Sequence, residues 1–171
     1  RIGATVLAPM LISNQLDVLP GTNSLIKELP FAIHSFLRRL MFRPIRNKAS
    51  EFSRFAEMLE KDVIKTTVNR NNEGIITFIT QNGDNKIELD IKEVSSTIKA
   101  LSNLIVFLKY DATPDTVLII DEPELHLHTD SQRRVAQVLA MLVRAGLKVV
   151  VSTHSFTILQ EFNNLLLLGG K

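Results

Sequence analysis

The sequence predicts an α/β fold with parallel strands and crossover helices, and two apolar runs carry this prediction. Residues 117–120 read Val-Leu-Ile-Ile, and residues 148–152 read Lys-Val-Val-Val-Ser. Runs so rich in β-branched side chains are typical of strands in a parallel sheet, and we expect the first to be buried on both faces. A helical pattern separates the two runs, so together they predict one βαβ unit with a right-handed crossover.

The helix between the two strands has a start signal, an apolar stripe and a stop signal. Thr129 and Gln132 have the S/T-x-x-E/Q spacing of a capping box. Gly146 stands where a glycine commonly ends a helix. The apolar residues that repeat at helical intervals are Val135, Val138, Leu139, Leu142 and Val143. We therefore expect one helix between Thr129 and Gly146.

Polar residues follow both strands at their carboxyl ends. Asp121 and Glu122 follow the first strand, and His154 follows the second. Parallel strands deliver these residues to one edge of the sheet, where ligands bind in open α/β folds. A cation, or a water molecule to be activated, would suit such a site. The simpler interpretation is a strand that ends in polar residues and a histidine with a structural role.

This region resembles a known family. IIDEPELHLH (residues 119–128), followed by VVVSTHS (residues 149–155), is similar to the Walker B, D-loop and switch-histidine region of ABC-type ATPases. The form DEPELHLH is most similar to the OLD-like and SMC-like AAA ATPase branch, and the resemblance covers residues 75–169. It implies the C-terminal part of a P-loop NTPase head domain that binds ATP and Mg²⁺.

The resemblance also implies a role for each residue at the strand ends. Asp121 would hold Mg²⁺ through its water shell, Glu122 would be the general base, and His154 would contact the γ-phosphate. The implied reaction is phosphoryl transfer to water, in which positioning and charge stabilisation supply most of the catalysis. The resemblance further implies a homodimer that sandwiches the nucleotide between its subunits.

A serine-rich loop precedes a second helical stripe, which consists of Ile98, Leu101, Ile105 and Leu108. By resemblance, Ser95 matches the signature serine of these ATPases, and Ser96 and Thr97 match the two glycines that follow it. A helix N-terminus suits this role because its unpaired N–H groups bind phosphate. Thr97 departs from the pattern, since its Cβ disfavours positive φ and crowds a backbone approach. The structural alternative is that these residues only cap the helix.

His126 and His128 form an H-x-H pattern between the first strand and the helix. Such a pair could ligate a metal ion, although no further ligands cluster near it in the sequence. By resemblance this segment is the D-loop, which crosses the dimer interface, and His128 counts among the nucleotide-binding residues. Thr129 stands where this branch usually has proline.

The rest of the chain divides into two expected parts. Residues 1–70 are predicted to be a mainly helical segment, in which Ala4–Ile12 is either a strand or a short helix. Residues 71–171 are predicted to be the C-terminal part of the ATPase domain, beginning with a β-hairpin around the Asn82-Gly83 pair. The apolar run at residues 164–168 is predicted to be another strand of the sheet.

Composition limits the compartment and what the chain can do alone. The 171 residues include no cysteine, which excludes disulfides and thiolate metal sites and is compatible with a reducing cytoplasm. No apolar run approaches the length of a membrane-spanning helix. The phosphate-loop pattern G-x-x-x-x-G-K-[S/T] does not occur, and both ends look cut from a longer polypeptide. The isolated chain is therefore expected to be inactive.

Three functions stay open on the sequence alone. The first is an ATPase coupled to DNA metabolism or defence, with nucleic acid or an attached nuclease as a partner. The second is a dimerisation or scaffold module that has lost nucleotide binding. The third is a nucleic-acid-binding regulator, supported only by the basic run from Arg38 to Lys48, for which a solvated helical face is the commoner cause. A phosphate loop encoded upstream of Arg1 would favour the ATPase.

Overall fold

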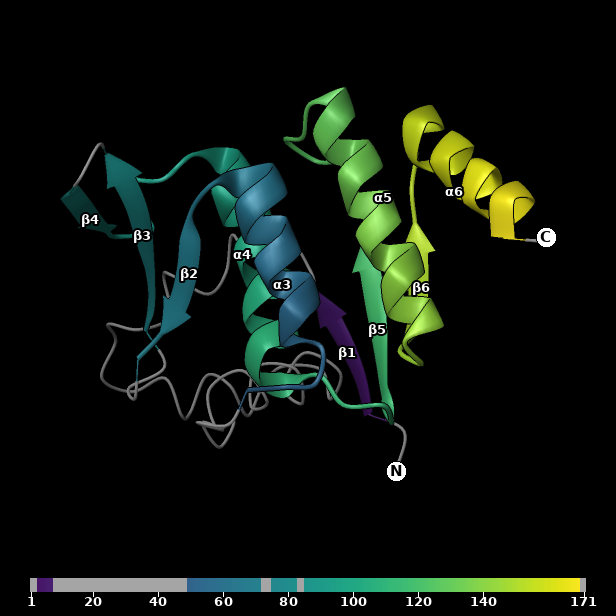
Figure 1. Cartoon of the computed structure of the whole chain (residues 1–171), viewed down its shortest axis with the longest axis horizontal. Helices are drawn as coiled ribbons and strands as arrows, with labels where there is room; N and C mark the ends of the chain where they lie inside the picture. Colours follow the sequence, from purple (N-terminus) through teal and green to yellow (C-terminus); the bar gives the residue numbers. More distant parts are fainter. Residues whose placement is uncertain (1–2, 8–48, 72–74, 83–84, 170–171) are drawn as a thin grey trace, which may run out of the picture.

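The computed structural model describes residues 3–7, 49–71, 75–82 and 85–169 (Figure 1). Within them lie two three-stranded sheets and the helices that pack between and beside them. The basic run Arg38–Lys48 lies outside the described residues. None of the described helices is both long and apolar enough to cross a membrane.

A parallel sheet forms the part of the fold that holds the strand ends predicted above. Its strand order is β1 (Gly3–Leu7), β5 (Thr116–Asp121), β6 (Lys148–Ser152), with β5 in the centre. Both neighbours of β5 run parallel to it, which confirms the predicted βαβ unit and the α/β fold class. Residues 4–12 were predicted to be a strand or a short helix, and residues 4–7 belong to strand β1. Residues 8–12 lie outside the described part.

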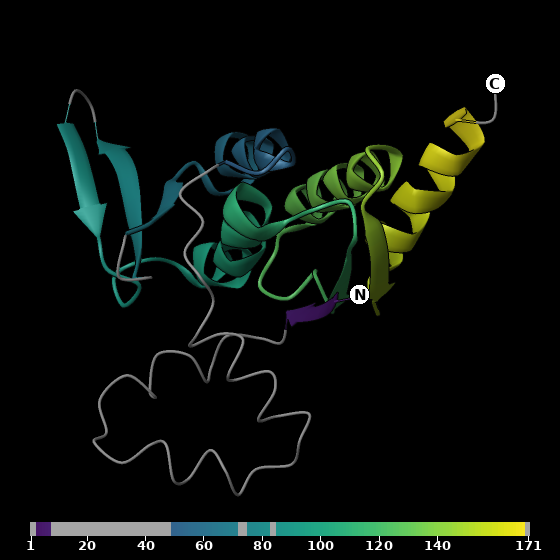
Figure 2. The same cartoon turned by 90° about the horizontal axis from the view of Figure 1, so that it is seen from below.

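Three of the described helices, with their continuations, lie on one face of this sheet (Figure 2). They are α3 (Ser53–Leu59) with its π-helical continuation Glu60–Ile64, α4 (Ser96–Val106) with its π-helical continuation Phe107–Asp111, and α5 (Thr129–Arg144). Successive strand side chains point to opposite faces, so Leu118 and Ile120 are buried under the helices whereas Val117 and Ile119 are partly exposed. The prediction that this strand is buried on both faces is therefore wrong for the described part of the chain.

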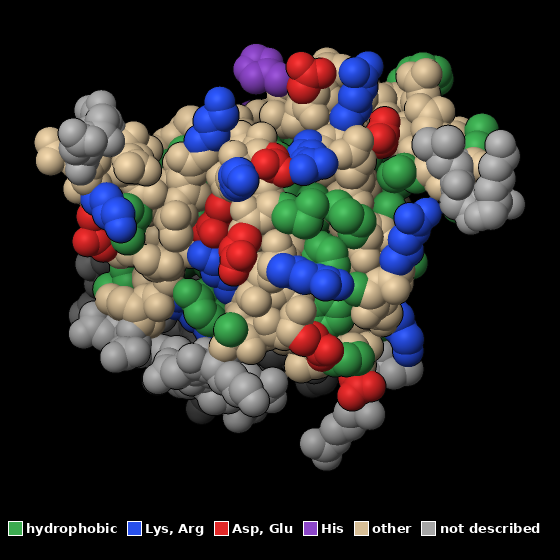
Figure 3. Space-filling view, viewed as in Figure 1, with side chains coloured by type: hydrophobic (Ala, Val, Ile, Leu, Met, Phe, Trp, Pro, Cys, Tyr) green, Lys and Arg blue, Asp and Glu red, His purple; other side chains and the backbone are tan. Residues whose placement is uncertain are grey.

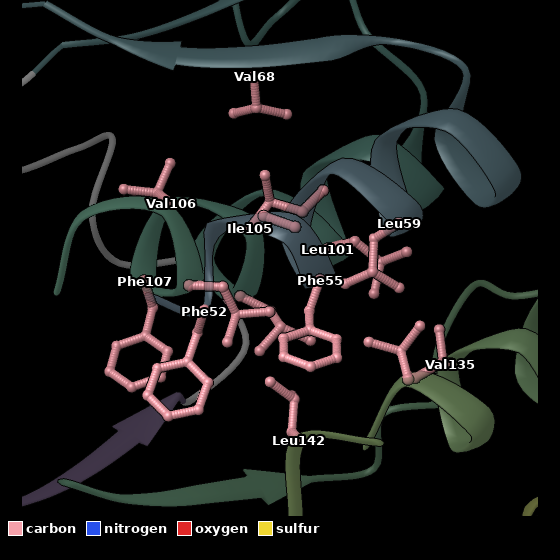
Figure 4. Close-up of a cluster of buried hydrophobic side chains, with 14 of the residues drawn as sticks. Phe52, Phe55, Leu59, Val68, Leu101, Ile105, Val106, Phe107, Val135 and Leu142 are labelled. Carbon is pink, nitrogen blue, oxygen red and sulfur yellow. The ribbon is translucent and has the colours of Figure 1, made fainter. Parts of the chain in front are cut away.

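The core lies between the helices and the sheet (Figure 4). Its largest fully buried side chains come mainly from the helices and from strands of both sheets, and each of them is less than 2% exposed. They include Phe52, Leu59, Ile105, Leu118, Leu139 and Leu142. Burial of each such side chain contributes roughly 1.5–3 kcal/mol, and the shared core fixes the position of α4 relative to β5.

Helix α5 begins differently from what its sequence predicts but ends at the predicted glycine. The residue that caps its N-terminus is His128, so Thr129 is already helical and the predicted capping box is wrong. The Gln132 side chain donates to the Leu127 carbonyl at 3.0 Å instead. At the other end the prediction is confirmed, because Gly146 has φ +95° and follows the last helical turn.

The glycine end of α5 is a Schellman motif. The Gly146 amide donates to the Val143 carbonyl, and the Leu147 amide donates to the Leu142 carbonyl, both at 3.0 Å. Leu142 and Leu147 are both buried, as the motif's hydrophobic contact requires. Val143, which the helical spacing placed on the apolar stripe, is 53% exposed and lies outside the core.

A second, antiparallel sheet stands beside the first and consists of β2 (Thr67–Arg70), β3 (Ile76–Asn82) and β4 (Asn85–Leu89). Strands β3 and β4 pair from Phe78 opposite Leu89 to Asn82 opposite Asn85, which confirms the predicted hairpin. The first 70 residues, predicted to be mainly helical, thus contribute β1 and β2 as strands in their described part.

The C-terminal segment is a helix, α6 (Phe156–Gly169), so the strand predicted at residues 164–168 is wrong. An unbroken apolar run does not distinguish a strand from a helix, and leucine is among the best helix formers. The start of the helix is fixed at Ser155, whose hydroxyl oxygen accepts a 3.2 Å hydrogen bond from the Ile158 amide. Helix α6 lies beside α5 (Figure 1), where Gln137 donates to Glu161 at 2.8 Å.

Candidate functional site

The candidate site lies where β5 and β6 end, at the upper edge of the sheet in Figure 1. The strands are in register there, with Asp121 of β5 opposite Ser152 of β6. The N-terminus of α4 and the turn between β5 and α5 reach the same edge. The surface view shows histidine and acidic side chains at this edge (Figure 3).

Asp121 is the last residue of β5 and its side chain is exposed. The Ser152 hydroxyl donates to Oδ1 of Asp121, so one carboxylate oxygen has a protein partner. Mg²⁺ is usually held through one or two carboxylates, with waters and phosphate oxygens filling its other positions. An exposed aspartate fixed on one side by a neighbouring strand fits that mode of binding.

Glu122 continues from the strand into a turn with a left-handed backbone, at φ +47°. Its amide donates to the Ser152 carbonyl at 3.0 Å, so its backbone is still tied to β6. Its Oε1 lies 3.6 Å from Nε2 of His154. The Glu122 and His154 side chains are 37% and 90% exposed, so both can meet a ligand from solvent.

Glu124 is a residue of this site to which the sequence analysis assigned no role. Its Oε1 accepts hydrogen bonds from the amides of His154 at 2.7 Å and Ser155 at 3.0 Å. Its Oε2 accepts one from the Thr153 hydroxyl at 2.8 Å. The signal that could have found it is a third carboxylate in this segment, two residues beyond Glu122.

These contacts also set the charge of Glu124. Burial acts to raise the pKa of its carboxyl, but the hydrogen bonds from its own amide, the Thr153 hydroxyl and the amides of His154 and Ser155 outweigh burial and hold the pKa below its ordinary value. Glu124 is therefore a carboxylate at neutral pH, and it anchors the loop that carries His154.

A second contact fixes the same loop from α5. The Ser155 hydroxyl donates to Oε1 of Gln132 at 2.6 Å, while the Ser155 amide is also 3.0 Å from the Thr153 hydroxyl oxygen. Gln132, predicted as part of a capping box, thus serves to join the start of α5 to the start of α6. The His154 ring itself projects from an anchored backbone.

The serine-rich loop before α4 has the geometry of a helix cap. Ser95 has an extended backbone, and its hydroxyl oxygen accepts a hydrogen bond from the Ile98 amide at 3.4 Å. Ser95 and Ser96 are exposed at the helix N-terminus, where unpaired N–H groups can bind an anion. Thr97 is inside α4, so it needs no positive φ, and its hydroxyl donates to the carbonyl of His126 at 2.7 Å.

The histidines of the turn are both exposed, and His126 has φ +62°. In the part of the chain that the structure describes, no group of three or more His, Cys, Asp or Glu side chains is placed to hold a metal ion. His128 caps α5 through its backbone. The structure therefore brings Asp121, Glu122 and His154 to one edge, and places the α4 N-terminus beside them through the Thr97–His126 contact.

A known protein family matches the sequence of this chain. The family described as "AAA domain, putative AbiEii toxin, Type IV TA system" matches residues 23–160. That range includes every residue of the candidate site.

Two curated relatives match shorter segments. An ABC multidrug transporter, SNQ2, from Candida glabrata is 39% identical over 64 residues, which are 35% of this chain and 4% of the transporter. The Old nuclease of Escherichia phage P2 is 42% identical over 45 residues, which are 26% of this chain and 8% of the nuclease. The matched segments are thus a small part of each relative.

Among solved structures, the chain is similar to heads of SMC ATPases. One was described for ATP-driven dimerization and DNA stimulated activation of SMC ATPases; it has a TM-score of 0.47 and 22% identity over 64% of this chain and 71% of that chain. The SMC head domain from Thermotoga maritima has a TM-score of 0.43 and 14% identity over 81% of this chain and 43% of that chain.

Proposed function

This chain belongs to the AAA domain family and is an ABC-type ATPase domain, and from that premise we propose that its sheet edge binds Mg²⁺–ATP and transfers the γ-phosphoryl group to water. The observation that supports this proposal is the meeting of Glu122 and His154, 3.6 Å apart, beside the exposed Asp121. Phosphoryl transfer depends on positioned charges rather than on a covalent intermediate. Asp121 and Glu122 are fixed by contacts to Ser152, and His154 is fixed by its amide bond to the Glu124 carboxylate.

In this proposal Asp121 holds Mg²⁺ through its water shell. The Ser152 hydroxyl orients the carboxylate by donating to Oδ1, which leaves lone pairs for hydrogen bonds to water. When bound, Mg²⁺ neutralises negative charge on phosphate oxygens. Ser152 is then a supporting residue, since it touches the carboxylate and not the ion.

Glu122 acts as the general base. Its carboxylate accepts the proton of the attacking water. The hydrogen bond from the Glu122 amide to the Ser152 carbonyl fixes the backbone from which this side chain extends. His154 contacts the γ-phosphate, and its backbone is anchored by Glu124 and by the neighbouring Ser155 contact to Gln132. A base needs correct geometry before it needs an unusual pKa.

The exposed N-terminus of α4 supplies the contact to a second subunit. We place Ser95, Ser96 and the backbone of Thr97 against the nucleotide of a partner in a homodimer, with His128 on the turn that crosses the interface. The support is that Ser95 and Ser96 are exposed at a helix N-terminus, which favours phosphate binding.

The wider setting is also a proposal. Residues 71–171 would carry the ATPase part and residues 1–70 the segment before it, with β1 of that segment completing the sheet. Coupling to nucleic acid or to an attached nuclease is supported by the 42% identity with the Old nuclease of phage P2. A cytoplasmic location is supported by the lack of cysteine in the sequence.

Replacement of Glu122 by glutamine in the complete protein tests the proposal. Glutamine keeps the shape but accepts no proton, so kcat is expected to fall by about 10²–10⁴-fold while nucleotide still binds. A dimer trapped with ATP should then double the mass seen by light scattering. Glu88→Gln, on an exposed position of β4, is the matched control and should hydrolyse ATP normally. Unchanged hydrolysis in Glu122→Gln contradicts the assignment, and a wild-type protein that binds no ATP favours the scaffold function.

A further inference from the structure

The turn Glu122–Leu127 is fastened to three other segments of the chain. The Glu122 amide donates a hydrogen bond to the Ser152 carbonyl of β6, and the Glu124 carboxylate accepts one from the amide of His154 in the loop after β6. The third contact comes from α4, where the Thr97 hydroxyl donates to the His126 carbonyl at 2.7 Å. This last contact spans 29 residues of sequence and joins the two elements proposed to face the partner subunit.

The turn needs such contacts because its backbone is strained at both ends. Glu122 has φ +47° and His126 has φ +62°, and they are two of the three non-glycine residues with positive φ in the described part of the chain. Side chains with a Cβ adopt this region unfavourably. Strained conformations persist where the surroundings over-determine them, and they cluster at functional sites.

The turn is also short and internally bonded, so its ends do not move independently. The Leu125 amide donates to the Glu122 carbonyl at 3.1 Å, and the Leu127 amide donates to the Glu124 carbonyl at 3.0 Å. Pro123 and Leu127 are buried and hold the turn against the body of the domain. A displacement of His126 therefore reaches Glu122 through the covalent backbone of the turn, which these two hydrogen bonds brace.

We propose that Thr97 is a positioning residue, whose hydroxyl couples the first turn of α4 to the catalytic carboxylate of Glu122 within the same subunit. The inference rests on the proposed function and concerns its regulation. A nucleotide that binds at Ser95 and Ser96 shifts or stiffens the N-terminus of α4, and Thr97 transmits this change to the turn. Hydrolysis in one subunit's site thereby depends on whether its α4 is engaged by the partner's nucleotide.

The Thr97 hydroxyl has no other task in the helix. Ser95 already provides the cap, and the Thr97 donor bonds a carbonyl outside its own element. The glycine found at this position in the family pattern lacks a hydroxyl and cannot form this bond. Valine matches threonine in shape and removes only the hydroxyl, so it isolates the contribution of the bond.

The test compares Thr97→Val, Thr97→Ser and Thr116→Val in the complete protein. Thr116 is the matched control, because its hydroxyl bonds that of Thr113 at 2.8 Å at the opposite end of β5. Loss of one neutral hydrogen bond should lower kcat of Thr97→Val about three- to tenfold with KM for ATP unchanged. Thr97→Ser should restore kcat, and Thr116→Val should keep it at the wild-type value.

Hydrogen exchange supplies a readout that does not need turnover. Without nucleotide, the amides of Leu125 and Leu127 should exchange faster in Thr97→Val and return to the wild-type rate in Thr97→Ser. A wild-type protein without ATP hydrolysis overturns the proposed function and this inference with it. Hydrolysis with an unchanged kcat in Thr97→Val, an equal loss in Thr116→Val, or no rescue by serine overturns only the coupling.

Discussion

The amide of His154 donates a 2.7 Å hydrogen bond to Oε1 of Glu124, so a carboxylate on the turn after β5 positions the loop after β6. The same oxygen accepts the Ser155 amide, and the other oxygen accepts the Thr153 hydroxyl. Three donors of one loop thus converge on one side chain. This anchor fixes the backbone of His154 while its ring stays exposed.

Replacement of Glu124 by alanine is expected to destabilise the protein by about 1–3 kcal/mol, because donors in a partly buried loop lose their acceptor. Glu124→Gln keeps an oxygen in place and should cost less. Urea denaturation at neutral pH measures both free energies of unfolding, with Glu88→Gln on β4 as the control. Equal stability of Glu124→Ala and wild type would contradict the anchor.

The lowered pKa of Glu124 predicts how this effect depends on pH. A carboxyl with a depressed pKa in the folded state stabilises the fold above its unfolded pKa of about 4.3. This stabilisation is lost as the pH falls through the lower folded pKa. The difference in unfolding free energy between wild type and Glu124→Gln should therefore be constant near neutral pH and shrink below about pH 4. A difference that grows on acidification would refute this prediction.

An ion pair between the buried Glu60 and the partly buried Lys109 predicts a separate loss of stability. Oε1 of Glu60 accepts the Val68 amide at 2.5 Å and Nζ of Lys109 at 2.6 Å, and Lys109 also donates to the Val68 carbonyl. Lys109→Met leaves a buried charge without its counter-charge and should cost about 3–5 kcal/mol. The double variant Glu60→Gln/Lys109→Met should lose less than Lys109→Met alone.

The exposed pair Asp130–Arg133 is the control for this experiment. Arg133→Met should change the urea midpoint little, since exposed ion pairs contribute little to stability. If Lys109→Met behaves like Arg133→Met, the Glu60–Lys109 contact does not stabilise the fold.

The elements predicted correctly are those with a strong local signal. The β-branched runs gave β5 and β6, and Gly146 gave the end of α5 because its left-handed backbone favours glycine. The predicted start of α5 is wrong, because the N-cap residue is His128 and not Thr129. The Gln132 side chain forms hydrogen bonds with the Leu127 carbonyl and the Ser155 hydroxyl instead of closing a capping box. The spacing of residues along the helix does not reveal that a distant residue, here Ser155, forms a hydrogen bond with the same side chain.

The site residues also divide into those that the sequence predicted and those that it did not. The convergence of Asp121, Glu122 and His154 follows from parallel strands, which bring their carboxyl ends to one edge. The roles of Glu124 and Thr97 depend on contacts to loops 30 and 29 residues away in sequence. No periodicity encodes such pairs, so the partners of these two side chains could be identified only from the folded turn.

Isolated residues 1–171 are expected to bind Mg²⁺–ATP weakly. A phosphate loop supplies many of the contacts to the β- and γ-phosphates in these ATPases, and its sequence pattern does not occur here. Titration calorimetry of the purified chain with Mg²⁺–ATP measures the affinity, with the complete protein as the comparison. A micromolar Kd for the isolated chain would show that its own residues form the main nucleotide site.

Replacement of Ser95 distinguishes a helix cap from a contact to the partner's nucleotide. Its hydroxyl oxygen accepts the Ile98 amide at a long 3.4 Å, so as a cap alone Ser95→Ala should cost about 0.5 kcal/mol and leave turnover intact. If Ser95 meets the γ-phosphate, Ser95→Ala should instead lower ATP-dependent dimerisation and turnover with little change in Tm. Ser95→Arg should be worse, because a long side chain at the exposed helix N-terminus would block the approach of the second subunit.

The measurement pairs thermal melting without nucleotide with ATPase rate against protein concentration in the complete protein. Ser50→Ala is the control for a serine far from the nucleotide, since the Ser50 hydroxyl oxygen accepts the Phe52 amide at 3.1 Å and the hydroxyl donates to the Ala112 carbonyl at 2.8 Å. Ser50→Ala should lower Tm more than Ser95→Ala, because it removes two hydrogen bonds whereas Ser95→Ala removes one. Only Ser95→Ala should shift the concentration at which the rate is half-maximal. A destabilised but fully active Ser95→Ala protein would leave Ser95 with the role of a cap and remove the proposed contact across the dimer.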